Sequence, residues 1–348
     1  MTNGRASFRS PAGPWIGGVE QLGACPICGS AERSILHARM KDCVFFVAPG
    51  EWTLWTCQTC RSAYLDPRPD EHSIGRAYSK YYTHRESSQS VRRSLARLLR
   101  ISVGNAYRWK RFGIDAKPRL PFASNATRLF PQQRRSIDIQ ARLLPQPGTS
   151  RQRLLDIGCG GGIFLEFVSS SRRLCFGVEP DPVARKLACS RGFDVRADIS
   201  EWDEPEAFDA ITLNHVIEHL HRPAEILREA WKLLRHSGTI FVETPNIDSY
   251  GHDQFSRSWL ALDVPRHLIL FNKSSLQNLL VDAGFVDIRF HPRFENYGES
   301  ALQSKRIAKG LDPFGSDSSE EPVQQPQLSP SWLPPEKVEF LTLTARKP

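Results

Sequence analysis

Four cysteines near the start of the sequence have a spacing that suits a metal ion. Cys25 and Cys28 form one C-x-x-C turn, and Cys57 and Cys60 form a second. Two such turns bring four thiolates to the corners of a tetrahedron, which is the arrangement of a structural zinc site. A redox role needs only one pair. The sequence therefore favours a structural zinc with no coordination position left for water.

A glycine-rich stretch follows a buried apolar run in the second half of the chain. In LLDIGCGGG, Asp156 precedes Gly158, Gly160 and Gly162, and these glycines permit a ligand to approach the backbone closely. The third glycine comes one residue too early for a nicotinamide fingerprint. Glu179 ends the next apolar run, where a carboxylate can accept both hydroxyls of a ribose.

Residues 215–219, HVIEH, fit the H-x-x-E-H pattern in which two histidines of one helix bind zinc in peptidases. A peptidase also needs a third ligand and a substrate groove, and nothing else in the sequence indicates either. The stretch instead follows an apolar strand pattern, where we expect the crossover helix to begin. Glu218 and His219 could simply stabilise the first turn of that helix.

These residues must be positioned by the elements around them, which alternate between strand and helix patterns from residue 151 onward. The alternation predicts an α/β fold with a doubly wound, mainly parallel, seven-stranded sheet, preceded by a small N-terminal zinc ribbon. Ligands of such sheets bind at the carboxyl ends of the strands. The polar residues that end the strands are therefore candidates for a binding site.

Several segments resemble class I S-adenosylmethionine-dependent methyltransferases. LLDIGCGGG is similar to their first motif, VEPD to their acidic second strand, and the stretch from FDAITLNHVIEHL to FVETPN to their motifs IV and V. The resemblance covers about residues 151–285. The cysteine ribbon, YLDPRP and the pair Tyr81–Tyr82 resemble a bacterial subgroup that is linked with modification of sugars, polysaccharides or small metabolites.

The resemblance implies a Rossmann-like methyltransferase fold and assigns roles to the cofactor-binding residues. It places Asp156 and the three glycines at the methionine end of S-adenosylmethionine, Glu179 at the ribose, Asp198 at the adenine amino group and Asn214 beneath the methionyl moiety. The related ubiquinone O-methyltransferases carry E-x-x-E-H, which is associated with a divalent cation, where this chain begins with His215. A cation at Glu218 and His219 and a purely structural role for both therefore stay open.

Transfer of a methyl group to a hydroxyl is helped by a base that titrates near neutral pH, which histidine does. His215 directly follows a strand, and His267 lies in the segment DVPRHL, which resembles the substrate side of the subgroup. Either one could be the catalytic base, and for each an ordinary hydrogen-bonded histidine is an equal alternative.

We expect a flexible N-terminus at 1–20, a zinc ribbon at 21–70, a basic helical connector at 71–150, and a methyltransferase domain at 151–348 with a loose insertion at about 308–335. Residues 91–142 contain thirteen Lys and Arg against two acidic residues, in a chain of net charge +8. We interpret this excess as a solvated helix face. A nucleic acid, an anionic membrane surface and a phosphorylated substrate are the alternatives.

The sequence thus predicts a methyltransferase that uses S-adenosylmethionine and O-methylates a sugar, a polysaccharide precursor or another small metabolite, such as a nucleotide sugar or glycan. The alternative is an RNA methyltransferase whose ribbon and connector bind phosphates. No apolar run is long enough to span a membrane, and the N-terminus lacks the apolar core of a secretory signal. We therefore expect a cytoplasmic protein without a membrane span.

Overall fold

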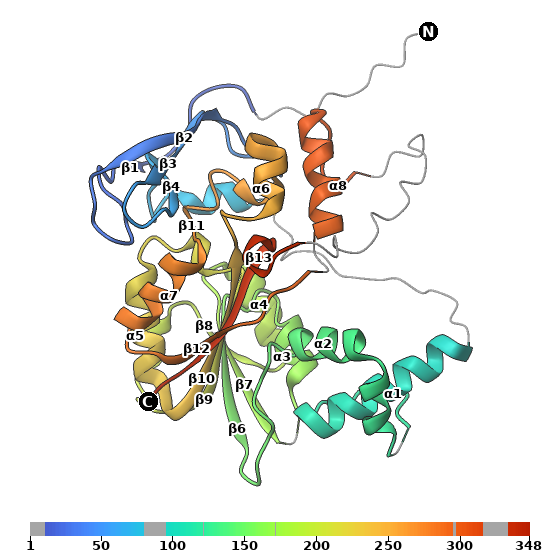
Figure 1. Ribbon diagram of the computed structural model, residues 1–348. Coiled ribbons are helices and arrows are strands. Elements are labelled where there is room, and N and C mark those ends of the chain that lie inside the picture. The colour runs from blue at the N-terminus through green and yellow to red at the C-terminus, as the bar shows by residue number, and fades with distance from the viewer. Residues whose placement is uncertain (1–10, 80–94, 121, 171, 295–296, 316–332) are drawn as a thin grey trace.

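The computed structural model describes residues 11–79, 95–120, 122–170, 172–294, 297–315 and 333–348. Its centre is a seven-stranded sheet of order β12-β13-β10-β9-β6-β7-β8 (Figure 1). Within this sheet β13 runs antiparallel to both neighbours, and the other strands are parallel to one another. The predicted α/β fold is confirmed. The strands are β6 (Gln152–Ile157), β7 (Arg173–Val178), β8 (Asp194–Arg196), β9 (Phe208–Asn214), β10 (Leu234–Pro245), β12 (Val286–Phe290) and β13 (Phe340–Arg346).

Helices cover both faces of the sheet (Figure 1). One face carries α3 (Ile163–Val168) and α4 (Pro182–Ser190), and the other carries α5 (Pro223–Leu233) and α7 (Lys273–Asp282). Local sequence explains where α4 begins, because the Asp181 carboxylate accepts from the backbone N–H groups of the first turn and Pro182 occupies the first helical position. Such a cap contributes about 1 kcal/mol.

The N-terminal ribbon shares its sheet with the second half of the chain. Strands β2 (Arg33–Met40), β3 (Trp52–Cys57) and β4 (Ala63–Leu65) are joined by β11 (Ile269–Leu270), which pairs antiparallel with β4. Their buried side chains belong to the same core as those of β9, α5 and α7. The ribbon and the central sheet therefore pack as one body, and burying each large apolar side chain between them contributes about 1.5–3 kcal/mol.

Residues 95–140 form a helical lobe at one side of the sheet, which we call the basic lobe (Figure 1). It consists of α1 (Leu95–Phe112), η3 (Ala123–Leu129) and α2 (Pro131–Gln140). Tyr107, Phe112 and Ile137 are buried in a core that also holds side chains of β6 and α3. The segment expected to be a connector thus packs on the sheet.

The remaining elements are short or peripheral. They are β1 (Val19–Glu20), β5 (Arg68–Pro69), α6 (Tyr250–Phe255), α8 (Tyr297–Ala308) and the 3₁₀ turns η1 (Ile74–Tyr78), η4 (Ile199–Glu201), η5 (Ile217–His219), η6 (Ser256–Ser258), η7 (Leu260–Leu262) and η8 (Pro335–Lys337). Tyr81, Tyr82, residues 1–10 of the expected flexible N-terminus and most of the expected insertion lie outside the described residues. Among the helices described, none is long and apolar enough to cross a membrane.

Candidate functional site

The glycine loop connects β6 to α3 and packs tightly against the segment that follows β9. Gly158 has φ +71°, and a Cβ added there would lie 2.4 Å from Cγ2 of Val216. Gly162, at φ +81°, would place a Cβ 3.1 Å from the Cβ of Ala188 on α4. Both positions therefore need glycine for backbone conformation and for space. A cavity of about 540 Å³ opens beside this loop and is lined by Arg142, Gly160 and Phe164, among others.

Asp156, near the end of β6, is fully buried, and only one of its two carboxylate oxygens accepts hydrogen bonds from the described residues. Its Oδ1 accepts from Thr212 Oγ1 at 2.7 Å and from the Arg142 guanidinium. Its Oδ2 is buried and has no hydrogen-bond partner among the described residues. Burial raises the pKa of Asp156, and the charge of Arg142 opposes that rise. The arrangement suits a ligand that brings a positively charged donor.

Glu179 and Asp198 follow β7 and β8, and Asn214 ends β9. The Glu179 carboxylate is buried and accepts from Gly160 N at 2.8 Å and Asp181 N at 2.9 Å, so it joins the glycine loop to the start of α4. Asp198 is exposed and caps η4 by accepting from Ser200 N. The carboxyl ends of parallel neighbouring strands meet at one edge, so the structure gathers these side chains there.

The stretch HVIEH forms a 3₁₀ turn, which corrects our expectation that it begins the crossover helix. His215 has φ +54°, η5 covers only Ile217–His219, and α5 begins at Pro223. Pro223 is suited to the first position of a helix and so sets the later start. The two histidines of the H-x-x-E-H pattern are therefore not presented by one helix, as a zinc peptidase requires.

Glu218, His219 and His267 converge on one point, each offering one atom within 4.8 Å of the others. His267 Nδ1 lies 2.7 Å from Ala261 O, and His219 Nδ1 lies 3.0 Å from Arg266 O. A carbonyl can only accept, so the Nδ1 atom of each ring carries a hydrogen. Glu218 Oε2 accepts from Thr244 Oγ1 at 2.9 Å, whereas its buried Oε1 lies 3.4 Å from His215 Nδ1.

This carboxylate–histidine cluster is suited to bind a proton donor or a metal ion. Burial lowers the pKa of His219 to about 4, so its ring is neutral at pH 7. Burial would raise the pKa of Glu218, but the hydrogen bond and the charge of His215 outweigh it, and the pKa is lowered to about 2. The neutral imidazole of His219 and the ring of His267, both beside the Glu218 carboxylate, can hold a divalent cation or accept a hydrogen bond from a hydroxyl.

His215 lies beside this cluster, and both of its ring nitrogens face carboxylates. Nδ1 lies 3.4 Å from Glu218 Oε1, and Nε2 lies 3.5 Å from Glu243 Oε1. Burial lowers the pKa of His215, but the two carboxylates outweigh this effect and raise it to about 9. The sequence pattern did not single out Glu243, although a glutamate within the apolar run of FVETP is a signal that could have identified it.

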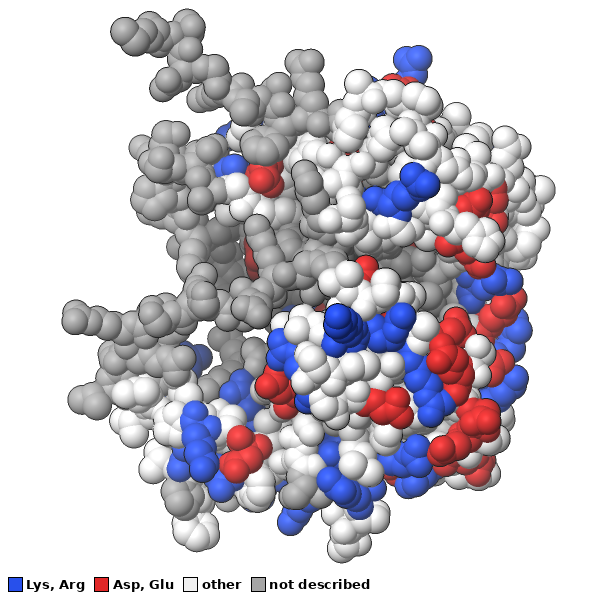
Figure 2. Space-filling model, turned by 180° about the vertical axis from the view of Figure 1, so that it is seen from behind, with Lys and Arg blue, Asp and Glu red and all other residues white. Residues whose placement is uncertain are grey.

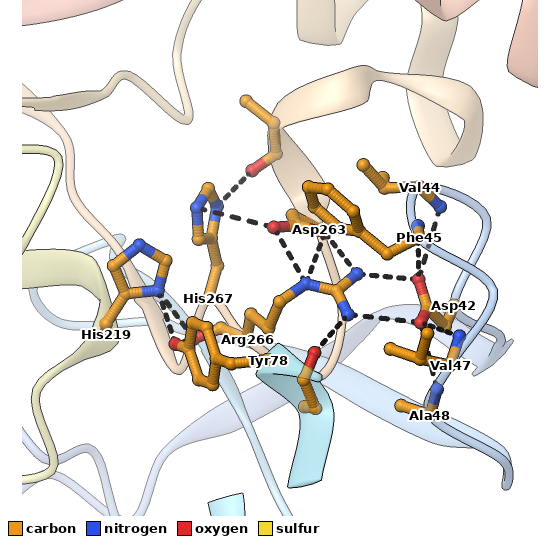
Figure 3. Close-up of polar contacts among 12 residues, drawn as sticks. Asp42, Val44, Phe45, Val47, Ala48, Tyr78, His219, Asp263, Arg266 and His267 are labelled. Atoms are coloured by element: carbon orange, nitrogen blue, oxygen red, sulfur yellow. Dashed lines mark hydrogen bonds and ion pairs between the residues drawn. The ribbon is translucent and has the colours of Figure 1, made fainter. Parts of the chain in front are cut away.

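A fully buried arginine connects the cluster to the ribbon (Figure 3). Arg266 donates to both oxygens of Asp42, at 2.6 and 3.1 Å, and to Asp263 at 2.5 Å. Figure 3 shows His267 and His219 on one side of Arg266 and the ribbon residues on the other. Sequence reasoning missed this contact because Asp42 and Arg266 are 224 positions apart.

The four ribbon cysteines come together as their spacing predicts. Their sulfur atoms all lie within 4.8 Å of one another, with Cys25 Sγ 3.6 Å from Cys60 Sγ and Cys28 Sγ 3.5 Å from Cys57 Sγ. In both turns the residue four positions after the first cysteine donates its N–H to that cysteine's carbonyl. Four converging sulfurs on two matching turns fit a tetrahedral zinc ion.

Residues 124–289 match the model of a family described as a methyltransferase domain. Over 161 residues the chain is 32% identical to a probable S-adenosylmethionine-dependent methyltransferase of Mycobacterium tuberculosis, covering 44% of this chain and 56% of that protein. Over 110 residues it is 36% identical to a ubiquinone biosynthesis O-methyltransferase of Aeromonas salmonicida, covering 28% and 45%. The chain thus spans about half the length of these curated relatives.

A crystal structure of a SAM-dependent methyltransferase from Archaeoglobus fulgidus has 23% identity and a TM-score of 0.42, covering 65% of this chain and 100% of that one.

Proposed function

We propose that this chain, which carries an S-adenosylmethionine-dependent methyltransferase domain, transfers a methyl group from that cofactor to a hydroxyl of a small molecule. The cofactor supplies an activated methyl on a sulfonium. The protein must therefore align the acceptor with that methyl and exclude water. The residues at the carboxyl ends of β6, β7, β8 and β9 provide the binding groups.

The glycine loop and its acidic neighbours fit the cofactor. Asp156 Oδ2, a buried acceptor without a partner among the described residues, would receive the ammonium group of the methionine end. The backbone of Gly158, Gly160 and Gly162 would lie along that end, with Asn214 beneath it. Glu179 would accept from the ribose hydroxyls, and Asp198 would face the adenine amino group.

The observation that carries the choice of a hydroxyl acceptor is the carboxylate–histidine cluster beside the cofactor loop. Val216, which packs against Gly158, is two residues from Glu218, so the cluster follows directly after the segment that borders the glycine loop. His267 is suited to accept the hydroxyl proton because Ala261 O holds the hydrogen of its Nδ1, so that Nε2, 4.0 Å from Asp263 Oδ2, is the ring atom that can take the proton. His215 is less suited, since both of its nitrogens face carboxylates.

The acceptor class is a sugar, a polysaccharide precursor or another small metabolite. A relative named for O-methylation in ubiquinone biosynthesis supports a small acceptor and oxygen as the methylated atom. We further propose that Cys25, Cys28, Cys57 and Cys60 hold one structural zinc, because four thiolates leave no position for a substrate.

The test is transfer from methyl-labelled S-adenosylmethionine to a panel of nucleotide sugars, quinols and RNA, with product identification by mass spectrometry. We expect label on a hydroxyl of one of the small molecules. His267→Gln should lower turnover at least about 100-fold, the usual contribution of general base catalysis, without changing cofactor affinity. His236→Gln is the control. His236 lies near the start of β10, whereas the candidate site lies at the carboxyl end of that strand, so the substitution should change neither turnover nor cofactor affinity.

Three results would contradict the proposal. Label found only in RNA would show that the acceptor is a nucleic acid and not a small molecule. If His267→Gln keeps wild-type turnover with the true acceptor, His267 does not accept the hydroxyl proton. Failure of the purified chain to bind S-adenosylmethionine in calorimetry would reject the activity altogether.

A further inference from the structure

The basic lobe carries the excess charge of the whole protein. Residues 95–140 contain ten Lys and Arg against Asp115 and Asp138, a net charge of +8 that equals the net charge of the entire chain. Asp138 accepts from Tyr107 OH within the lobe, and Asp115 is paired with Arg119 at 3.1 Å. The remaining basic side chains include several exposed ones, namely Arg100, Lys110, Lys117, Arg128, Arg134 and Arg135. Figure 2 shows blue and white side chains side by side over the lobe at the lower left, with a red group between them.

The same lobe exposes large apolar side chains at one end. Phe122 is 99% exposed and Leu129 is 78% exposed, and Leu99, Leu120 and Phe130 are exposed as well. We call these five residues the apolar tip. Together with Trp109, they are six of the thirteen large apolar residues that are exposed in the described part of the chain.

Hydrogen bonds place Leu120 and Phe130 near Leu99 at one end of α1, and Phe122 and Leu129 lie within two residues of Leu120 and Phe130 in the sequence. Leu120 N donates to Ser102 O at 3.4 Å, which holds Leu120 about one turn from Leu99 on α1. Gln133 Nε2 donates to Arg100 O at 2.9 Å, so the start of α2, with Phe130 just before it, lies at the same end of α1. Arg100 and Arg128 directly adjoin members of the tip in sequence. The tip therefore combines protruding apolar groups with positive charge.

We propose that the basic lobe docks peripherally on an anionic lipid membrane, with the apolar tip inserted among the headgroups. Anionic lipids attract clustered Lys and Arg, and exposed aromatic and aliphatic side chains bury their area at the headgroup boundary. A nucleic acid would match the charge and stack on Phe122 and Phe130, but it would leave the aliphatic side chains of Leu99, Leu120 and Leu129 exposed, whereas a membrane buries all five. The C-terminal residue of the lobe, Gln140, also lines the cavity beside the glycine loop, so α2 connects the apolar tip with that cavity.

The test is flotation of the full chain with vesicles of phosphatidylcholine alone or with about 30 mol% phosphatidylglycerol, close to a strongly anionic leaflet. We expect at least about tenfold more binding to the anionic vesicles, weakened by salt. The double variant Phe122→Ser/Leu129→Ser should lose at least about tenfold of that binding, because two exposed apolar groups no longer insert. The readout is independent of methyl transfer, so it stands or falls separately from the proposed function.

Matched variants separate the lobe from the general surface. Leu99→Ser should weaken binding, whereas Ile35→Ser on β2 should not, although the two residues are exposed to similar extents, 59% and 57%. Likewise, Arg100→Glu should weaken binding, and Lys186→Glu on α4 should not. Circular dichroism melts check that each variant is folded.

Four outcomes would overturn the proposal. The first is equal binding to both kinds of vesicle, and the second is an equal loss of vesicle binding in Leu99→Ser and Ile35→Ser. The third is binding to RNA that is tighter than binding to vesicles and is unchanged by the apolar substitutions. The fourth is a concentration-dependent dimer in sedimentation that Phe122→Ser/Leu129→Ser dissociates, which would assign the tip to a second copy of the chain.

Discussion

Replacing Asp42 by alanine should destabilise the whole protein, although Asp42 lies in a loop of the ribbon. Its carboxylate is fully buried and accepts from Val44 N, Phe45 N, Val47 N and Ala48 N at 2.9–3.2 Å. It also accepts two hydrogen bonds from the buried guanidinium of Arg266 (Figure 3). The substitution thus leaves a loop without its acceptor and removes one partner of a buried ion pair.

The expected loss follows from these contacts. Breaking a buried ion pair by removing one partner costs about 3–5 kcal/mol. Arg266 keeps its bonds to Asp263, which holds the cost within that range. We therefore expect Asp42→Ala to lower the free energy of unfolding by about 3–5 kcal/mol, a large share of the 5–15 kcal/mol typical of a domain. Asp42→Asn should cost less, because an amide oxygen still accepts from the loop.

Urea denaturation followed by far-ultraviolet circular dichroism and tryptophan fluorescence measures this change. Both probes should shift together, because the ribbon and the sheet share one core. The control is Glu51→Ala in the same ribbon, which removes exposed ion pairs to Arg39 and Lys41 at 3.6 and 3.5 Å. That variant should lose less than about 1 kcal/mol.

The pH dependence has a definite sign. Burial would raise the pKa of Asp42, but the Arg266 bonds outweigh it and hold the pKa below its ordinary value of 3.8. A carboxylate with a lowered folded pKa contributes stability that is complete above the unfolded value and is lost as the pH falls through the folded value. The difference between wild type and Asp42→Asn should therefore persist at pH 7 and shrink only below pH 3.8. If Asp42→Ala costs no more than Glu51→Ala, the reasoning is wrong.

Three further predictions concern the cofactor loop and the metal. Gly158→Ala should weaken S-adenosylmethionine binding at least about tenfold in calorimetry, because the added Cβ would clash with Val216. The control is Gly192→Ala, which also has positive φ but open space around it and should leave the affinity unchanged. Elemental analysis should find one zinc per chain, and Cys57→Ser should remove it. Cys43→Ser is the control and should keep the zinc, because Cys43 is exposed and outside the sulfur cluster. Retention of zinc in Cys57→Ser would reject the site. If His267 acts directly as the base, the carboxylate–histidine cluster holds no metal, and both the wild type and His219→Gln should contain only the one zinc of the ribbon. A second bound ion in the wild type that His219→Gln loses would show that the cluster binds a metal.

Several features could be predicted from the sequence because their signals are local. The strands β6, β7 and β9 are short, largely apolar runs that end in or are followed by polar residues, and Asp181 and Pro182 mark the start of α4. The glycine loop and the cysteine turns have characteristic spacings, which depend on a few neighbouring residues. The resemblance to S-adenosylmethionine-dependent methyltransferases, confirmed by the family match, rests on the same short motifs.

Only the tertiary structure decided which distant residues meet. Nothing local indicates that Ile269 pairs with Tyr64 to complete the ribbon sheet, that Arg142 reaches Asp156, or that His267 joins Glu218 and His219. The letters HVIEH suit a helix or a turn equally well, and the later helix start at Pro223 selected the turn. Contacts such as Asp42 with Arg266 leave no periodic trace in the sequence, because chain packing brings together residues that are far apart along it.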